Sequence, residues 1–191
     1  FVEYALANFN PKCMLYFEVE GKGKSFVFLH GFLENHLIWN NLRKNLEKDA
    51  QIVTIDLPGH GNSAVMDETA TMETMADAVI EVLDELNIEQ ATFIGHSMGG
   101  YVTCALADLY QERVENIVLI NSSTLPDDDA KKNQRLRACE TAKKNFNALV
   151  SFSMPTLFAA HHRDNFIEEL KFVKEIALKT PIEGICAALK G

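Results

Sequence analysis

Short runs of apolar residues alternate along the chain with segments in which apolar residues recur roughly every three to four positions. Continuous apolar runs of this length are typical of strands that are buried on both faces of a parallel sheet. They lie at residues 26–29, 52–55, 92–94 and 117–120, and residues 13–20 are also expected to be extended. The pattern therefore predicts a mostly parallel sheet.

The segments between these runs have the periodicity of amphipathic helices. Residues 72–86 show it most clearly, because Met72, Met75, Val79 and Leu83 fall on one stripe. Helices are also expected at residues 36–47 and 97–110. Alternating strands and helices indicate right-handed β-α-β units, and hence an α/β sheet covered by helices.

The pattern changes after residue 120. Residues 121–129 form a turn-rich loop with an acidic run, and residues 130–190 show only helical periodicity. The acidic run is interpreted as a solvated N-terminal helix cap.

Composition excludes several classes of protein. A chain of 191 residues that is 47% hydrophobic can form one domain with a hydrophobic core. The net charge of −9 comes without a basic stripe, so neither nucleic acid nor an anionic membrane surface is an expected partner. No apolar run approaches the roughly 20 residues of a membrane span, and no leader peptide is recognisable.

The cysteines are widely scattered and show no metal-binding spacing, so no metal site is predicted. They are Cys13, Cys104, Cys139 and Cys186. We expect free thiols in a reducing, cytoplasmic compartment, with a disulfide among them as the alternative.

The strongest chemical signal is the sequence Gly95-His96-Ser97-Met98-Gly99, which follows a predicted strand and opens a predicted helix. This is the context of a G-x-S-x-G nucleophile elbow, rather than of a glycine-rich turn without chemistry. The tight turn needs Gly95 and Gly99 because there is no room for side chains. The helix N-terminus would place the Met98 N–H to hold a developing oxyanion. Ser97 is therefore the candidate nucleophile.

A second motif, His30-Gly31-Phe32, directly follows the first buried strand. An oxyanion hole needs a second N–H from the loop of a neighbouring strand, and the Phe32 N–H is the candidate. His30 is expected to order this loop rather than to act as a base.

A third stretch, residues 56–63, follows the next strand and is interpreted as a structural loop. Asp56 precedes the serine, which is the wrong chain order for the acid of a triad with this elbow.

With these three motifs in this order, the chain resembles the α/β-hydrolase superfamily from about Cys13 to Gly191. It is most similar to the lid-bearing esterase and enol-lactonase branch. The resemblance implies Ser97 as nucleophile, N–H donors at Phe32 and Met98, and no metal or organic cofactor. It also implies that residues 1–123 are the N-terminal part of the core and residues 124–191 a helical lid. A serine at the nucleophile position argues against the epoxide hydrolases and haloalkane dehalogenases, which use aspartate.

In the superfamily, the triad acid and histidine follow two further strands beyond the lid. We therefore expect this chain to be part of a longer enzyme, truncated or nicked, whose triad acid and histidine lie beyond Gly191. A C-terminal fragment or a second copy would complete the sheet. The strand at residues 117–120 would otherwise be an open apolar edge.

An internal triad is the alternative source of a base. The chain order serine, acid, histidine is met by Ser97 followed by one of the residues Asp127 to Asp129 and then by His161 or His162. However, no strand precedes either the acids or the histidines. His96 should point away from the serine, because neighbouring residues of a strand face opposite sides. His36 is expected at the surface or in packing.

The sequence thus predicts a serine hydrolase that cleaves a small carboxylic ester or lactone through an acyl-enzyme at Ser97. The chain alone is expected to be inactive or weakly active. Thioester cleavage, C–C bond hydrolysis and perhydrolysis use similar sites and stay open. The alternative from another class is a hydrolase-like receptor that binds a ligand with little turnover.

Overall fold

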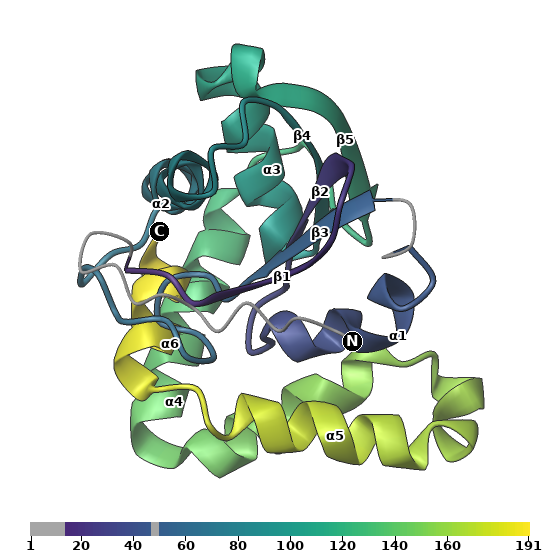
Figure 1. Ribbon diagram of the computed structural model, residues 1–191. Coiled ribbons are helices and arrows are strands. Elements are labelled where there is room, and N and C mark those ends of the chain that lie inside the picture. Colours follow the sequence, from purple (N-terminus) through teal and green to yellow (C-terminus); the bar gives the residue numbers. More distant parts are fainter. Residues whose placement is uncertain (1–13, 47–49) are drawn as a thin grey trace.

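The computed structural model describes residues 14–46 and 50–191. Cys13 and Glu47, for which the sequence analysis made predictions, lie outside these ranges. A five-stranded sheet forms the centre of the molecule (Figure 1). Its strands are β1 (Phe17–Gly21), β2 (Lys24–Leu29), β3 (Ala50–Ile55), β4 (Ala91–His96) and β5 (Val114–Ile120). Their spatial order is β1-β3-β2-β4-β5, in which β1 is antiparallel to β3 and the other pairs are parallel.

The predicted helices are present, with shorter bounds for the first one. In place of one helix over residues 36–47, the structure has η1 (His36–Trp39) and α1 (Asn40–Arg43). The next helices are α2 (Met72–Glu85), α3 (Met98–Leu109) and the short η2 (Gln111–Arg113). The Thr71 hydroxyl accepts a hydrogen bond from the Thr74 N–H at 3.2 Å, which fixes the start of α2.

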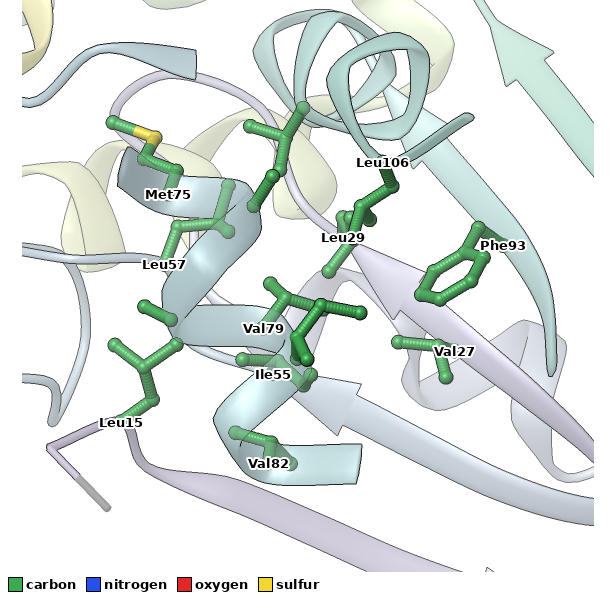
Figure 2. Close-up of a cluster of buried hydrophobic side chains, with 14 of the residues drawn as sticks. Leu15, Val27, Leu29, Ile55, Leu57, Met75, Val79, Val82, Phe93 and Leu106 are labelled. Atoms are coloured by element: carbon green, nitrogen blue, oxygen red, sulfur yellow. The ribbon is translucent and has the colours of Figure 1, made fainter. Parts of the chain in front are cut away.

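The two faces of the sheet bury different clusters, because successive side chains of a strand point to opposite sides. Val27, Leu29 and Phe93 face α2 and α3, which contribute Val79 and Leu106 to the main core (Figure 2). On the other face, a smaller cluster packs around the Trp39 ring of η1, and its strand residues are Phe28, Ala50, Ile52 and Ile94. The two-sided burial predicted from the apolar runs is thus confirmed for β2, β3 and β4.

Strand β5 is different, and the expectation of two-sided burial is wrong for it. It pairs with β4 along one edge, and among the described residues no strand pairs with its outer edge. Ile117 and Val118 are consequently 41% and 44% exposed. An open apolar edge of this kind is a surface on which a further strand can pair.

A helical unit follows β5, consisting of α4 (Asp129–Ser153), η3 (Met154–Leu157), η4 (Ala160–Asn165), α5 (Ile167–Ala177) and α6 (Ile182–Lys190). The Asp128 carboxylate accepts from the Lys131 N–H at 2.8 Å, so the acidic run does cap a helix. Helix α4 is interrupted at Asn145, whose φ of −157° and ψ of 84° are not helical. None of the helices in the described ranges is both long and apolar enough to span a membrane.

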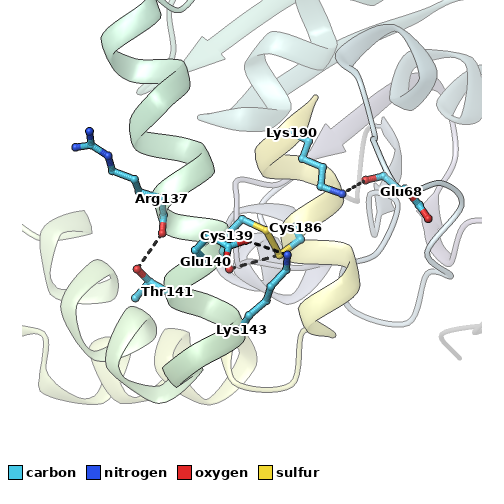
Figure 3. The surroundings of a disulfide bond; sticks show 8 residues. All are labelled: Glu68, Arg137, Cys139, Glu140, Thr141, Lys143, Cys186 and Lys190. Carbon is cyan, nitrogen blue, oxygen red and sulfur yellow. Dashed lines mark hydrogen bonds and ion pairs between the residues drawn. A yellow bond between two sulfur atoms is a disulfide. The ribbon is translucent and has the colours of Figure 1, made fainter.

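Two cysteines of this unit form a disulfide. Cys139 on α4 and Cys186 on α6 are 47 positions apart in sequence, and their Cα atoms are 5.0 Å apart (Figure 3). The prediction of free thiols is therefore wrong for this pair, because α4 and α6 pack side by side, which the spacing of the cysteines does not reveal. Cys104 is a free, half-buried thiol. The reducing compartment was inferred from unpaired cysteines, so the disulfide removes the support for that inference.

The helical unit packs against the loops that leave the sheet. Leu33, in the loop after β2, is fully buried in a cluster with residues of the helices, including Val150 and Ile185. The Ala70 N–H donates to the carbonyl of Ala187 on α6 at 3.1 Å. Burial of Leu33 couples the loop of the His30-Gly31-Phe32 motif to the helices.

Candidate functional site

Ser97 occupies the sharp turn between β4 and α3. Its φ of +49° and ψ of −112° are unusual for a residue other than glycine, and such strain persists only where the surroundings enforce it. The Ser97 N–H donates to the Ile120 carbonyl at 3.0 Å, and its own carbonyl accepts from the Ser122 hydroxyl at 2.8 Å. These bonds to β5 and to the residues that follow it hold the serine in place.

Gly95 and Gly99 allow this turn to close. A Cβ atom on Gly95 would lie 2.3 Å from the Gly99 carbonyl oxygen, and one on Gly99 would lie 2.3 Å from the Leu29 carbonyl oxygen. The first turn of α3 therefore rests directly on the end of β2. This contact brings the serine turn next to the loop that carries Phe32.

The backbone N–H groups of Phe32 and Met98 lie in these two adjacent segments. Neither donates a hydrogen bond to another residue in the described part of the chain. Met98 is the first residue of α3, where N–H groups have no partner within the helix and the helix dipole is positive. Both N–H groups are therefore available to donate to a further acceptor, and the positive helix end favours a negatively charged one.

His30 links the loop after β2 to the loop after β3. It is fully buried; its Nε2 accepts from the Leu57 N–H at 2.9 Å, and its Nδ1 bonds to the Gly31 carbonyl at 2.8 Å. Burial lowers the pKa of His30, although the charge of Asp56 acts in the opposite direction. A neutral ring with Nδ1–H donating fits both bonds and orders the loop.

Glu34 is a residue of this site that the sequence interpretation missed. Its Oε2 atom accepts from the Gly31 N–H at 2.6 Å and lies 2.8 Å from Nδ1 of His96. One carboxylate thus connects the loop after β2 with the end of β4. The only sequence signal was an acidic residue three positions after Gly31, in the loop at the carboxyl end of a strand.

Asp56 and His36 form a buried polar pair near the same edge of the sheet. The Asp56 Oδ1 atom accepts from the backbone N–H of His36 at 2.7 Å and lies 2.8 Å from its Nδ1, while Oδ2 accepts from the Asn62 N–H at 2.8 Å. Burial opposes ionisation of Asp56, but its hydrogen bond to His36 and the charges around it lower its pKa. His36 is therefore buried in packing rather than at the surface, and Asp56 orders the loop of residues 56–63.

The candidates for an internal triad lie in other contacts. Asp127 forms ion pairs with Arg135 and Lys131. His161 and His162 are exposed in η4, with their ring centroids 4.2 Å apart. All six histidines lie in the described ranges, and none of them is hydrogen-bonded to the Ser97 hydroxyl. Within those ranges, no three His, Cys, Asp or Glu side chains are grouped to bind a metal ion.

The chain is similar to known proteins in sequence. The model of the alpha/beta hydrolase fold family matches residues 24–170. A dihydrolipoyllysine-residue acetyltransferase component of an acetoin cleaving system, from Pseudomonas putida, is 31% identical over 185 residues. That match covers 96% of this chain, but the chain spans only 48% of that relative's length.

Solved structures share the fold. A thermophilic esterase from Thermogutta terrifontis superposes with a TM-score of 0.89 at 30% identity, covering 93% of this chain and 66% of that one. An enol-lactonase from Burkholderia xenovorans LB400 superposes with a TM-score of 0.84 at 24% identity, covering 93% of this chain and 70% of that one. The family model matches most of the chain's length, and the mostly parallel sheet and the strained serine turn agree with that match. The chain belongs to the α/β-hydrolase fold family.

Proposed function

We propose that this chain provides the nucleophile of a serine hydrolase that cleaves a small carboxylic ester or lactone through an acyl-enzyme. The observation that carries the proposal is the conformation of Ser97. Its strained backbone lies between a parallel strand and the N-terminus of α3. The residue is half-buried, and its hydroxyl forms no hydrogen bond with the described residues. A strained turn of this kind exposes a serine hydroxyl above the carboxyl edge of a sheet.

In this proposal, the Ser97 Oγ atom attacks the substrate carbonyl carbon while a base takes the hydroxyl proton. The N–H groups of Phe32 and Met98 hold the resulting oxyanion. The carbon–oxygen bond to the leaving alcohol then breaks, the alcohol takes up the proton, and water hydrolyses the acyl-serine ester. The supporting residues are Gly95 and Gly99, which close the turn, and His30 and Gly31, which order the Phe32 loop.

The esterase relative, at 30% identity, favours ester chemistry. Residues 1–123 would form the core part and residues 124–191 the lid. The helical unit carries apolar side chains that are not buried, among them Phe152, Leu157, Phe166 and Phe172. Such residues suit a pocket for a small apolar acyl group.

The base would come from outside the described residues. The histidine contacts above and the open edge of β5, where Ile117 and Val118 are exposed, support this part of the proposal. A further segment of the protein, or a second copy, that pairs with β5 would bring an acid and a histidine to the serine.

Intact mass spectrometry with a fluorophosphonate probe tests the proposal. We expect one adduct, which Ser97→Ala abolishes and Ser151→Ala, at an exposed serine of α4, does not. The 191-residue chain and the protein isolated from its source should be compared, because labelling only of a longer or assembled form would locate the base there. If Ser97 is unlabelled in every form, the proposal is wrong. Thermal stabilisation by an ester or lactone without product release would then indicate a receptor.

A further inference from the structure

Glu34 lies in the loop after β2 and is almost completely buried, with 4% of its surface exposed. A buried carboxylate needs partners, because removing a charge from water is costly. The two partners of its Oε2 atom come from different segments of the site. The Gly31 N–H lies at 2.6 Å, and Nδ1 of His96 lies at 2.8 Å.

These partners are the direct chain neighbours of the proposed machinery. Gly31 immediately precedes Phe32, and His96 immediately precedes Ser97. The site is also tightly closed around the carboxylate, since a Cβ atom on Gly31 would lie 2.7 Å from Oε2 of Glu34 and 2.9 Å from Nδ1 of His96. A single oxygen atom thus joins the loop after β2 to the last residue of β4, directly before the serine turn.

Charge makes this bridge strong. Burial disfavours the protonated form of His96, but the hydrogen bond and the charge of Glu34 outweigh it and raise the pKa of His96. Glu34 is the ionisable group that acts on this histidine. A protonated imidazole would also neutralise a carboxylate that otherwise opposes negative charge at the neighbouring oxyanion site.

We propose that Glu34 is a positioning residue, which fixes the spacing of the Phe32 and Met98 N–H groups by binding the Gly31 N–H and the His96 ring at the same time. This inference rests on the proposed function. Oxyanion donors act only when they are held at the correct separation, and a misplacement of about 1 Å can cost roughly 100-fold in rate. Glu34 itself touches neither substrate nor serine.

The test compares Glu34→Gln and Glu34→Ala with Glu81→Gln, a matched control at an exposed position of α2. The first measurement is NMR. In Glu34→Gln we expect a lower pKa of the His96 ring and simultaneous shifts of the Gly31, Phe32 and Met98 amide signals. Glu34→Gln keeps an acceptor for the Gly31 N–H, so its effects should be smaller than those of Glu34→Ala.

The second measurement is the kinetics of Ser97 labelling by the fluorophosphonate, in whichever form of the protein reacts. We expect the maximal labelling rate to fall about 10-fold to 100-fold in Glu34→Ala, with the half-saturating probe concentration unchanged. Thermal melts of the same samples report the folded fraction. A wild-type labelling rate in Glu34→Ala, or a loss that follows only the unfolded fraction, would overturn the inference.

The results distinguish a failure of the proposed function from a failure of the positioning role of Glu34. If wild type and Glu81→Gln are both unlabelled, the proposed function is wrong, and the NMR data still decide whether Glu34 joins the two segments. If both are labelled and the Glu34 variants show unchanged His96 titration and amide signals, only the positioning role is wrong.

Discussion

Gly59 and Gly184 meet backbone to backbone. A Cβ atom on Gly59 would lie 2.6 Å from the Cα atom of Gly184, and one on Gly184 would lie 2.1 Å from the Gly59 carbonyl oxygen. Gly59 belongs to the loop after β3, and Gly184 to α6. Two residues without side chains thus let the helical unit lie directly on the sheet loops.

Gly184→Ala should separate these two segments. The added methyl group has no space, so we expect a loss of about 1–3 kcal/mol in the free energy of unfolding. Urea unfolding measures this loss, with Ser151→Ala as an exposed control that should change stability by less than about 0.5 kcal/mol. Equal stability of both variants would show that the close contact is not maintained in solution.

Gly99→Ala should disrupt the serine turn. Its methyl group would lie 2.3 Å from the Leu29 carbonyl oxygen and 2.7 Å from that of His30, both of which are backbone atoms. We expect loss of Ser97 labelling together with a destabilisation of about 1–3 kcal/mol. Labelling kinetics and urea unfolding on the same samples separate the two effects. Normal labelling would contradict the packing of α3 on β2.

Stability should fall as the pH falls from about 7 to 5, because two buried histidines resist protonation. Burial and the neighbouring His30 lower the pKa of His60 to about 3, and burial lowers that of His30. An unfolded histidine titrates near 6.5, so their contribution is present above that pH and lost below it, by up to about 1.4 kcal/mol per pH unit for each.

His96 acts in the opposite direction. Its pKa is raised, so its contribution is present below pH 6.5 and is lost as the pH rises through the folded-state value. Urea unfolding between pH 5 and 8 measures the sum of these effects. His60→Gln should flatten the acid side of the curve, and an unchanged slope in this variant would contradict a buried neutral His60.

Reduction of the disulfide should destabilise the helical unit. The bridge closes a loop between residues 47 positions apart, for which we expect a contribution of about 2–4 kcal/mol. Cys139→Ser with Cys186→Ser should melt at a lower temperature than wild type and lose its sensitivity to dithiothreitol. Cys104→Ser serves as the control, because this thiol is free. A wild-type melting temperature that ignores reductant would argue against the bridge.

The edge of β5 should govern self-association of the 191-residue chain. Val118→Lys places a charge on the exposed edge strand, which disfavours pairing with another strand. We expect sedimentation of this variant to show more monomer than wild type as the concentration rises. Val65→Lys is the matched control, since Val65 is 38% exposed but lies outside the sheet. Identical behaviour of both variants would exclude the β5 edge as the contact.

The periodicity of apolar residues was sufficient to predict β2 to β4, α2 and α3, because both faces of these strands and one face of each helix are buried, which leaves a regular apolar pattern in the sequence. The spacing of Gly95, Ser97 and Gly99 likewise identified the turn. Periodicity gave no information on the pairing of Cys139 with Cys186, which depends on how α4 packs against α6.

Ionisable residues near the sheet edge were the least predictable. The sequence led to no prediction for Glu34 and left both the surface and packing open for His36, and both residues are buried by partners from other segments, His96 and Asp56. A polar residue can be buried only when such a partner is present, and sequence position does not reveal partners at long range. The contacts that connect the loops of the site therefore emerged only from the three-dimensional arrangement.

The strand order has one further consequence. From β2 the chain moves outward to β3, whereas from β4 it moves outward in the opposite direction to β5. The connections after β2 and β4 therefore diverge, and a sheet wound in this way has a crevice beyond the carboxyl ends of the two strands, at its topological switch point. Phe32 follows β2 and Ser97 follows β4, so both lie at this switch point. In the proposed hydrolase, a change of substrate would therefore require substitutions in the loops and helices beside the switch point, while the winding of the sheet keeps the site in the same place.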